Sequence, residues 1–336
     1  MRAAVTGAGG YVGTNLLQRL ADDGHDVVAV DRVRSDVAGE AVVWRQADVL
    51  DRQGVRAVIE GSDVVFHLAG KITLAPHDEE AWTVNTQGVR IAAEAALDAG
   101  VRRIVHCSSV HSFDQYGCGG RIDESTERSV DPSIPVYDRS KWAGEQELHT
   151  VIANGLDAVI CNPTGIYGPV DHGLSRGNAV LRQVARGRFP VNVEGGFDWV
   201  DVRDVASGLV AAADRGRKGE NYLLNGHFLT NREFFRRAAG FVGRRGPRVT
   251  LPLGVVKAAL PVIEPVGRRF RSDIISRGSL AAIECAPRVD GQRRATSSVM
   301  QRVPSKSQCA ISWRSSSPRA GSIGGDSDAD RRPEKR

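Results

Sequence analysis

Tyr137 and Lys141 are two side chains whose types and spacing could carry out proton-transfer chemistry together. They are four residues apart at the start of an expected helix over residues 136–154, so the phenol and the ammonium group share one helix face. The pKa of an unperturbed tyrosine is about 10, and a neighbouring cation lowers it by stabilising the phenolate. Tyr137 could then exchange a proton with a carbonyl or alcohol oxygen while a hydride reaches or leaves the adjoining carbon. Such pairs arise by chance in many helices, so other residues must support this interpretation.

A hydroxyl that could join this pair follows the expected strand over residues 103–107, in the segment Cys107-Ser108-Ser109-Val110. Ligands of parallel α/β sheets bind beyond the carboxyl ends of the strands, so a serine at this place faces the site. Ser108 and Ser109 are both candidates, and simple capping of the strand end is the non-catalytic alternative. The nearby His106 and His111 need no role in this interpretation.

The run Gly7-Ala8-Gly9-Gly10-Tyr11-Val12-Gly13 lies between an expected buried strand and an expected helix, which predicts a phosphate-binding turn. A helix N-terminus binds pyrophosphate through its unpaired N–H groups and its dipole, and glycine permits the close approach. Asp31, which ends the next expected strand, can accept hydrogen bonds from an adenosine ribose and would repel a 2′-phosphate. This favours NAD as the cofactor. Arg32 and Arg34 could pair with that phosphate, so NADP is the alternative.

Strands and helices alternate through the first part of the chain, which predicts an α/β fold with a doubly wound, parallel Rossmann sheet. The expected strands are 2–6, 26–31, 41–44, 64–68, 103–107 and 157–161, and the expected helices are 11–22, 52–59, 84–99 and 136–154. Shorter segments follow, with helices at 178–186, 202–213 and 231–242 and a strand at 221–224. We therefore predict a cofactor-binding domain over 1–165, a smaller C-terminal substrate lobe over 166–290 that interleaves with it, and a disordered tail over 291–336.

The excess positive charge of the chain lies in its last segment. Residues 277–336 contain 12 Lys and Arg against 6 Asp and Glu, which leaves the preceding 276 residues with 33 basic and 34 acidic side chains. The folded part therefore lacks the basic footprint of a nucleic-acid-binding protein. The sequence shows neither a stretch long enough to span a bilayer nor a secretory leader, so a cytoplasmic protein is expected. The five cysteines have no metal-binding spacing and are expected to be reduced thiols, and no metal site is predicted.

The order of several motifs resembles the extended short-chain dehydrogenases/reductases of the NAD-dependent epimerase/dehydratase superfamily. The matching segments, over about residues 1–250, are Gly7-x-x-Gly10-x-x-Gly13, Asp48-Val49, His67-Leu68-Ala69-Gly70, Asn85-Thr86-x-Gly88, Asn162 to Pro169 and Trp199 to Val205. The resemblance implies that Ser109, rather than Ser108, orients the substrate oxygen, with Tyr137 as acid/base. The cofactor contacts it implies are Gly7, Gly9, Gly10, Tyr11, Val12, Gly13, Asp31, Arg32, Asp48, Val49, Leu68, Ala69, Gly70, Asn85, Lys141 and Pro163.

Differences within this superfamily indicate the type of reaction. Members that dehydrate sugar nucleotides place an acidic pair beside the catalytic hydroxyl, whereas Ser109 is followed here by Val110-His111-Ser112. Sugar-nucleotide epimerases usually carry an Asn where this chain has Gly165. The segments 162–164 and 186–204 resemble dihydroflavonol-reductase-like and 3β-hydroxysteroid-dehydrogenase-like members instead. We therefore expect an oxidoreductase that interconverts a ketone and a secondary alcohol on a moderately apolar small molecule.

Two other functions remain as alternatives at this point. One is an NAD-dependent nucleotide-sugar epimerase. The other is a cofactor-binding regulatory protein without turnover, which the presence of Ser109, Tyr137 and Lys141 disfavours. Relatives often form homodimers through the two helices expected at 84–99 and 136–154, so a homodimer is the expected partner arrangement.

The composition changes abruptly near residue 291, where relatives usually end with a helix and a Leu-Gly-Tyr-x-Pro-like motif. Reverse translation from Ala295 with GC-rich codons, read two bases later, can produce a similar ending. This suggests the hypothesis that a frameshift near residues 291–294 replaced the native C-terminus. A natural basic extension is the alternative, and sequencing the gene across this point distinguishes the two.

Overall fold

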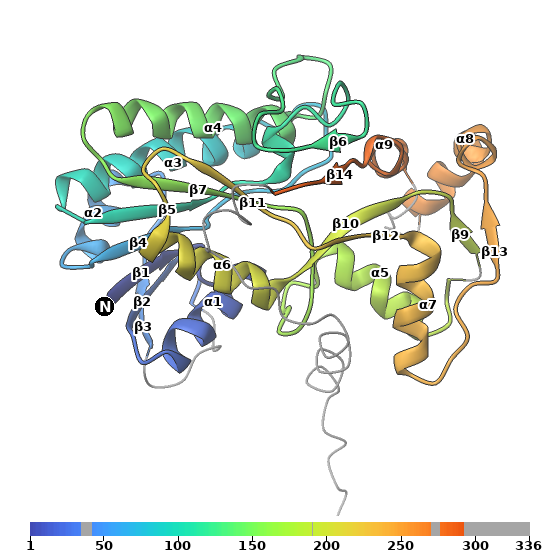
Figure 1. The fold of residues 1–336 in the computed structure, drawn as a ribbon, viewed down its shortest axis with the longest axis horizontal. Coiled ribbons are helices and arrows are strands. Elements are labelled where there is room, and N and C mark those ends of the chain that lie inside the picture. The colour runs from blue at the N-terminus through green and yellow to red at the C-terminus, as the bar shows by residue number, and fades with distance from the viewer. Residues whose placement is uncertain (35–41, 190, 270–275, 292–336) are drawn as a thin grey trace, which may run out of the picture.

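A seven-stranded parallel sheet forms the centre of the computed structural model, which describes residues 1–34, 42–189, 191–269 and 276–291 (Figure 1). Its strands lie in the order β11-β7-β5-β4-β1-β2-β3, and all six neighbouring pairs are parallel. They comprise β1 (Arg2–Thr6), β2 (Asp26–Asp31), β3 (Val42–Gln46), β4 (Val64–His67), β5 (Arg103–Cys107), β7 (Ala158–Pro163) and β11 (Asn221–Leu224). The predicted α/β, doubly wound parallel fold is confirmed.

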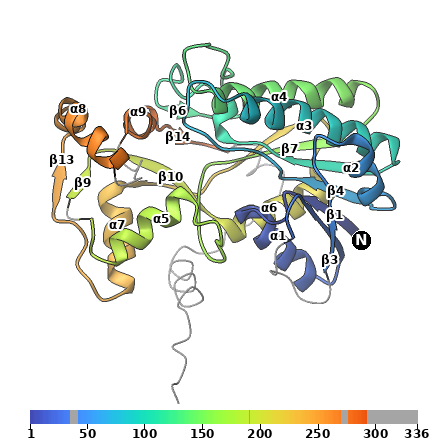
Figure 2. The same ribbon diagram turned by 180° about the vertical axis from the view of Figure 1, so that it is seen from behind.

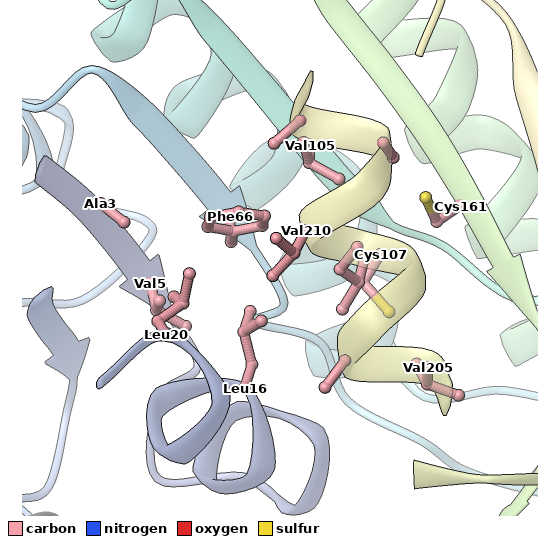
Figure 3. Packing of buried hydrophobic residues seen from close by; sticks show 14 of the residues in the cluster. Ala3, Val5, Leu16, Leu20, Phe66, Val105, Cys107, Cys161, Val205 and Val210 are labelled. Carbon is pink, nitrogen blue, oxygen red and sulfur yellow. The ribbon is translucent and has the colours of Figure 1, made fainter. Parts of the chain in front are cut away.

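Helices cover both faces of this sheet, because its strands are apolar on both sides. One face carries α1 (Tyr11–Asp22) and α6 (Val202–Arg215). The other face carries α2 (Arg52–Ile59), α3 (Glu79–Asp98) and α4 (Val136–Ala153). Figure 3 shows the core on the first face, where Leu16 and Leu20 of α1 and Val210 of α6 surround Phe66 of β4.

The strand order reverses between β1 and β4, which are neighbours in the sheet although β2 and β3 separate them along the chain. Doubly wound sheets bind their ligands in the crevice that forms at such a reversal, beyond the carboxyl ends of the strands. The glycine turn follows β1, and Leu68-Ala69-Gly70 follows β4. The topology therefore brings together two segments that the sequence assigns to the cofactor.

A smaller lobe lies beyond the carboxyl ends of the large sheet (Figure 2). It holds a sheet of β8 (Gly165–Tyr167), β10 (Gly196–Asp201) and β12 (His227–Thr230), together with α5 (Arg176–Ala185) and α7 (Asn231–Phe241). Its core is aromatic: Trp199 stacks on Phe234 with ring centroids 4.4 Å apart, and Tyr167 meets both rings edge-on. Between these lobe segments the chain returns to the large sheet through α6 and β11.

Several further elements were not predicted. They are η1 (Val110–Ser112), β6 (Arg121–Ile122), β9 (Val191–Val193), β13 (Val249–Leu251), α8 (Leu253–Arg269), α9 (Arg277–Cys285) and β14 (Arg288–Val289). β9 pairs with β13, and β6 pairs with β14. The paired strands are more than 50 residues apart in sequence. Strands of two or three residues are also too short to show an alternation of apolar and polar side chains, so the sequence did not predict them. Residues 292–336 lie outside the described residues, so the disordered tail and the frameshift hypothesis stay predictions.

The start of α3 corrects one expectation. The helix was expected from residue 84 but begins at Glu79, because the Asp78 side chain accepts a hydrogen bond from Ala81 N and caps it. Asn85 therefore lies in the second turn of α3 and not at its start.

Helices α3 and α4 pack very closely at Gly144, where a Cβ atom would overlap the Asn85 carbonyl oxygen. We expect Gly144→Ala to lower the free energy of unfolding by about 1–3 kcal/mol, because the extra methyl group must force the two helices apart. Urea unfolding followed by circular dichroism measures the change.

Gly240→Ala is the matched control for this prediction. Gly240 is an exposed glycine of α7, and a Cβ there would meet no atom within 4 Å. Its replacement is expected to stabilise the protein by up to about 1 kcal/mol through helix propensity. Equal destabilisation by the two substitutions would contradict the close approach of α3 and α4.

Candidate active site

The glycine turn over residues 7–13 packs so closely on neighbouring backbone that two of its positions leave no room for a Cβ atom. We call this turn the glycine cradle. Gly7 has a φ of +69°, and a Cβ there would lie 2.6 Å from the backbone nitrogen of Ala69. A Cβ at Gly13 would overlap Gly7 O and lie 2.8 Å from Ala8 Cα. Gly10 is the N-cap of α1 and no side chain caps this helix, whose first turn also holds no acidic residue. The turn therefore fits a pyrophosphate group, which would accept hydrogen bonds from the N-terminal N–H groups of α1.

Asp31 lies at the carboxyl end of β2 with its carboxylate fixed toward the glycine turn. Gly9 N donates to Asp31 Oδ2 over 2.9 Å, and Arg32 N donates to Oδ1 over 2.7 Å. The Arg32 guanidinium group is exposed and lies 3.9 Å from the Glu80 carboxylate. A negative charge therefore stands where the cofactor's ribose is expected, and the neighbouring arginine side chain faces a carboxylate.

The remaining predicted cofactor residues follow strand ends along the same edge of the sheet. Asp48 and Val49 come after β3, Leu68 to Gly70 after β4, and Pro163 ends β7. Val49 packs against Gly88 of α3. The structure thus gathers segments far apart in sequence at one edge, as the motif order predicted, while their contacts with a cofactor stay predictions.

Two predicted cofactor residues make protein contacts that the sequence did not indicate. The Asn85 amide is hydrogen-bonded to both backbone groups of Lys71, at 2.9 Å each, and donates to Ser140 Oγ over 3.0 Å. The Asn85 side chain thereby connects the segment after β4 with helix α4. The Tyr11 hydroxyl lies beside Gly168 of the lobe, 3.3 Å from where a Cβ would stand. These contacts connect the cofactor edge with α4 and with the lobe.

Ser109, Tyr137 and Lys141 converge beyond the carboxyl end of β5. Tyr137 and Lys141 stand on the same face of the first turns of α4, with Lys141 Nζ 5.8 Å from the centre of the Tyr137 ring. The Ser109 side chain lies close enough to the Tyr137 phenol to lower its pKa. The backbone N–H of His111 donates to Ser109 Oγ over 3.2 Å. The three predicted catalytic residues are therefore brought together.

Burial dominates the ionisation of this group. It raises the pKa of Tyr137 above its ordinary value, while the neighbouring Ser109 side chain acts in the opposite direction. Burial lowers the pKa of Lys141, and the nearby Cys107 and Glu145 oppose this change. The expected lowering of the Tyr137 pKa by Lys141 is thus not found in the protein by itself. At neutral pH the phenol keeps its proton, which is the form that an acid needs in order to protonate a carbonyl oxygen.

Glu145 is a residue of the site that the sequence interpretation missed. It lies one turn beyond Lys141 on the same face of α4, with a fully buried side chain. Its carboxylate accepts hydrogen bonds from Ser108 Oγ at 2.5 Å and from the side-chain amides of Asn162 at 2.7 Å and Asn221 at 2.9 Å. Arg128 Nη1 lies 3.2 Å from Oε2, the oxygen that also accepts from Asn221. The four-residue spacing of residues 137, 141 and 145 could have indicated that Glu145 belongs to the site. The hydrogen-bond partners of Glu145, however, come from four separate segments of the chain.

The Glu145 network also separates the two candidate serines. The Ser108 hydroxyl donates to Glu145, whereas the Ser109 side chain is the one that acts on the pKa of Tyr137. The geometry therefore favours Ser109 as the partner of Tyr137, as the resemblance implied.

Two buried histidines and a thiol lie behind the site. His67 and His106, on the neighbouring strands β4 and β5, stack with ring centroids 5.4 Å apart. Burial lowers the pKa of His67 to about 3 and that of His106 well below its ordinary value, so both are neutral. Burial raises the pKa of the Cys107 thiol to about 11, so it stays protonated at neutral pH and is a poor nucleophile. These three residues fill the core.

This fold and this site define a class: dinucleotide-binding α/β proteins with a Ser/Tyr/Lys group at the strand reversal. A sequence profile of the NAD dependent epimerase/dehydratase family matches residues 3–224. The chain therefore belongs to this family of NAD-dependent enzymes, and its identification as an extended short-chain dehydrogenase/reductase is confirmed.

Similar sequences include sterol demethylase protein B of Methylococcus capsulatus, which is 32% identical over 300 residues, 87% of this chain and 91% of that protein. A putative dihydroflavonol 4-reductase of Synechocystis is 32% identical over 276 residues, 79% of this chain and 80% of that protein. Among solved structures, gox2253 superposes with a TM-score of 0.77 at 28% identity, covering 92% of this chain and 96% of that one. A nucleoside-diphosphate-sugar epimerase of Pseudomonas aeruginosa has a TM-score of 0.75 at 24% identity, covering 93% and 96%. The latter likeness shows the fold alone.

No helix in the described ranges is long and apolar enough to cross a membrane.

Glu145→Ala is expected to lower the free energy of unfolding by about 3–5 kcal/mol, because it leaves the Arg128 charge and two buried amides without their shared acceptor. Thermal and urea unfolding measure the loss. Glu147→Ala is the matched control on the same helix: its side chain is 37% exposed and reaches Arg90 only at 3.6 Å. That change is expected to stay within about 0.5 kcal/mol. Similar losses in the two variants would refute a stabilising role for the Glu145 network.

Proposed function

We propose that this protein is an NAD-dependent oxidoreductase that interconverts a ketone and a secondary alcohol on a moderately apolar small molecule. The observation that carries the proposal is the convergence of Ser109, Tyr137 and Lys141 beside the glycine cradle. A nicotinamide held there supplies or accepts a hydride. Ser109 orients the substrate oxygen, Tyr137 exchanges a proton with it, and Lys141 binds the nicotinamide ribose and adds positive charge near the phenol.

The contacts of the remaining predicted cofactor residues follow from this arrangement. The backbone N–H groups of Tyr11, Val12 and Gly13 would hold the pyrophosphate, and Asp31 would accept hydrogen bonds from the adenosine ribose. Asp48 and Val49 lie on the side where the adenine would stand. Each of these assignments rests on the position of the residue at the sheet edge.

The residues beside Ser109 favour simple oxidation and reduction over elimination. Where dehydratases carry an acidic pair beside the catalytic hydroxyl, Ser109 is followed here by Val110, His111 and Ser112, none of which is acidic. Ser112 Oγ accepts hydrogen bonds from Asn162 and Arg128. The one carboxylate next to Tyr137 in sequence, Asp138, is bonded to His111. An elimination would need a free acid and base at these places.

Relatives support an apolar substrate. Besides the sterol demethylase protein B, they include a 3 beta-hydroxysteroid dehydrogenase/Delta 5-->4-isomerase of Mycobacterium tuberculosis, 29% identical over 272 residues, 74% of this chain and 72% of that protein. A polycyclic alcohol or ketone is therefore the first substrate class to test. The alternative, a nucleotide-sugar epimerase, has its own relative in a UDP-glucose 4-epimerase of Mycolicibacterium smegmatis, 32% identical over 267 residues.

The wild-type protein is expected to reduce a steroid, flavonoid or cyclic aliphatic ketone. Tyr137→Phe is expected to abolish this reduction, because it removes the proton donor. NADH binding, followed by nicotinamide fluorescence, should stay within about twofold of wild type, which shows that the fold is intact. Turnover retained by the variant would remove Tyr137 from the mechanism. Turnover of UDP- or dTDP-sugars by the wild type, with none of any ketone, would replace the proposed function by the epimerase alternative.

Asp31→Ser tests the choice between the two cofactors. The substitution removes a charged acceptor and the repulsion of a 2′-phosphate, so NADH affinity is expected to fall by about 10- to 100-fold, the value of a hydrogen bond to a charged group. NADPH affinity should be unchanged or increased. Fluorescence titration with both cofactors measures the ratio. A wild-type preference for NADPH, unaltered in the variant, would contradict the proposed role of Asp31.

A further inference from the structure

His111 is built into the catalytic group more firmly than the sequence indicated. Its backbone N–H donates to Ser109 Oγ, and its carbonyl accepts from Ser129 Oγ over 2.9 Å. Its ring meets the Tyr137 ring edge-on, with centroids 5.4 Å apart and an interplanar angle of 64°. The imidazole is therefore a direct neighbour of the phenol.

The position of the proton on His111 follows from its partners. Nδ1 lies 2.9 Å from Asp138 Oδ1, and Gln115 Nε2 lies 2.8 Å from the same ring nitrogen. An ionised carboxylate can only accept, so Nδ1 carries the proton, and the Gln115 amide then turns its oxygen rather than its nitrogen toward it. Nε2 is left as the atom that gains and loses a proton.

The proposed reaction needs such an atom, because Tyr137 loses its proton in every reduction and must regain it from water. The Ser109, Tyr137 and Lys141 residues are only 7%, 7% and 6% exposed. Asn85, the amide near Lys141, is already bound to Lys71 and Ser140. The His111 side chain is 34% exposed, whereas that of its partner Asp138 is 5% exposed. His111 therefore connects the buried phenol with solvent.

We propose that His111, oriented by Asp138, exchanges protons between Tyr137 and solvent. The inference rests on the proposed oxidoreductase function. In reduction, the Tyr137 O–H bond breaks as the O–H bond of the product forms, and the hydride with its electron pair comes from the reduced nicotinamide. The tyrosinate then takes the Nε2 proton of His111, directly or through one water. His111 takes a proton from solvent, and oxidation of the alcohol runs the same steps backward.

The charged and titratable groups around His111 set the pH at which it acts. Asp138, Tyr137 and Lys141 face it from α4. Burial acts to lower the pKa of His111, but the charge and hydrogen bond of Asp138 outweigh it, and Lys141 opposes Asp138. The pKa consequently lies above the ordinary value of 6.5.

The loop after η1 and helix α9 complete these surroundings. The loop contributes the uncharged Gln115, together with Asp114 and Tyr116, and Cys285 of α9 lies near Tyr116. Reduction consumes the proton that His111 supplies, so reduction should slow as pH rises through the His111 pKa and oxidation should accelerate. Asp138 raises the pKa at which this change occurs.

His111→Gln keeps a polar side chain of similar size but cannot titrate. We expect its kcat for reduction to fall by about 10- to 100-fold, within the usual range for acid–base groups, and the limb of the pH profile above 6.5 to disappear. Asp138→Asn should move that limb to lower pH. Imidazole added to His111→Ala should restore part of kcat. His25→Gln, at the amino edge of the sheet, is the control and should leave both rate and profile unchanged.

Two results would overturn the proposal. One is a His111→Gln variant with wild-type kcat and pH profile, or a His111→Ala variant that imidazole does not restore. The other needs no turnover: nitrogen NMR of labelled histidine that finds the neutral ring protonated on Nε2 instead of Nδ1. Failure of the underlying function is distinguishable, because it would appear as an absence of ketone turnover in the wild type or as activity retained by Tyr137→Phe.

Discussion

The buried carboxylate of Glu145 is the interaction on which the arrangement of the site depends. A charge without solvent must be satisfied by hydrogen bonds and a counter-ion, and here the partners come from the carboxyl ends of β5 and β7, from Asn221 at the start of β11 and from Arg128. These contacts fix α4 against the strand ends. Tyr137 and Lys141 extend along the same helix face, so their position relative to Ser109 is set by the network below them.

A second constraint acts at the other side of the crevice, where the backbone after β4 approaches the glycine turn after β1. Gly7 and Ala69 are in contact there, and Gly70 lies against Asn85 and Lys141. The cradle for the pyrophosphate and the proton-transfer group therefore share one connecting segment, which Asn85 holds in place. Packing therefore connects the glycine turn with the segment that contacts Lys141.

The electrostatics of the group are dominated by burial. The phenol of Tyr137 and the ammonium group of Lys141 are both pushed toward their neutral forms, and the two histidines on β4 and β5 are neutral. His111 is different, because it is partly exposed and paired with Asp138. A buried histidine without a neighbouring carboxylate thus stays neutral and packs in the core. A partly exposed histidine paired with a carboxylate can exchange protons.

The sequence by itself determined the parallel sheet, the glycine turn and the Tyr137–Lys141 pair, because these depend on periodicity and on spacings of a few residues. It also identified Asp31 at the end of its strand. Tertiary structure showed that Ser108 is held by Glu145, and it revealed Glu145 as the centre of a network whose partners Asn162 and Asn221 are 17 and 76 residues away. It likewise paired His111 with Asp138 across 27 residues. Such contacts arise only when strand ends converge, and no local pattern encodes them.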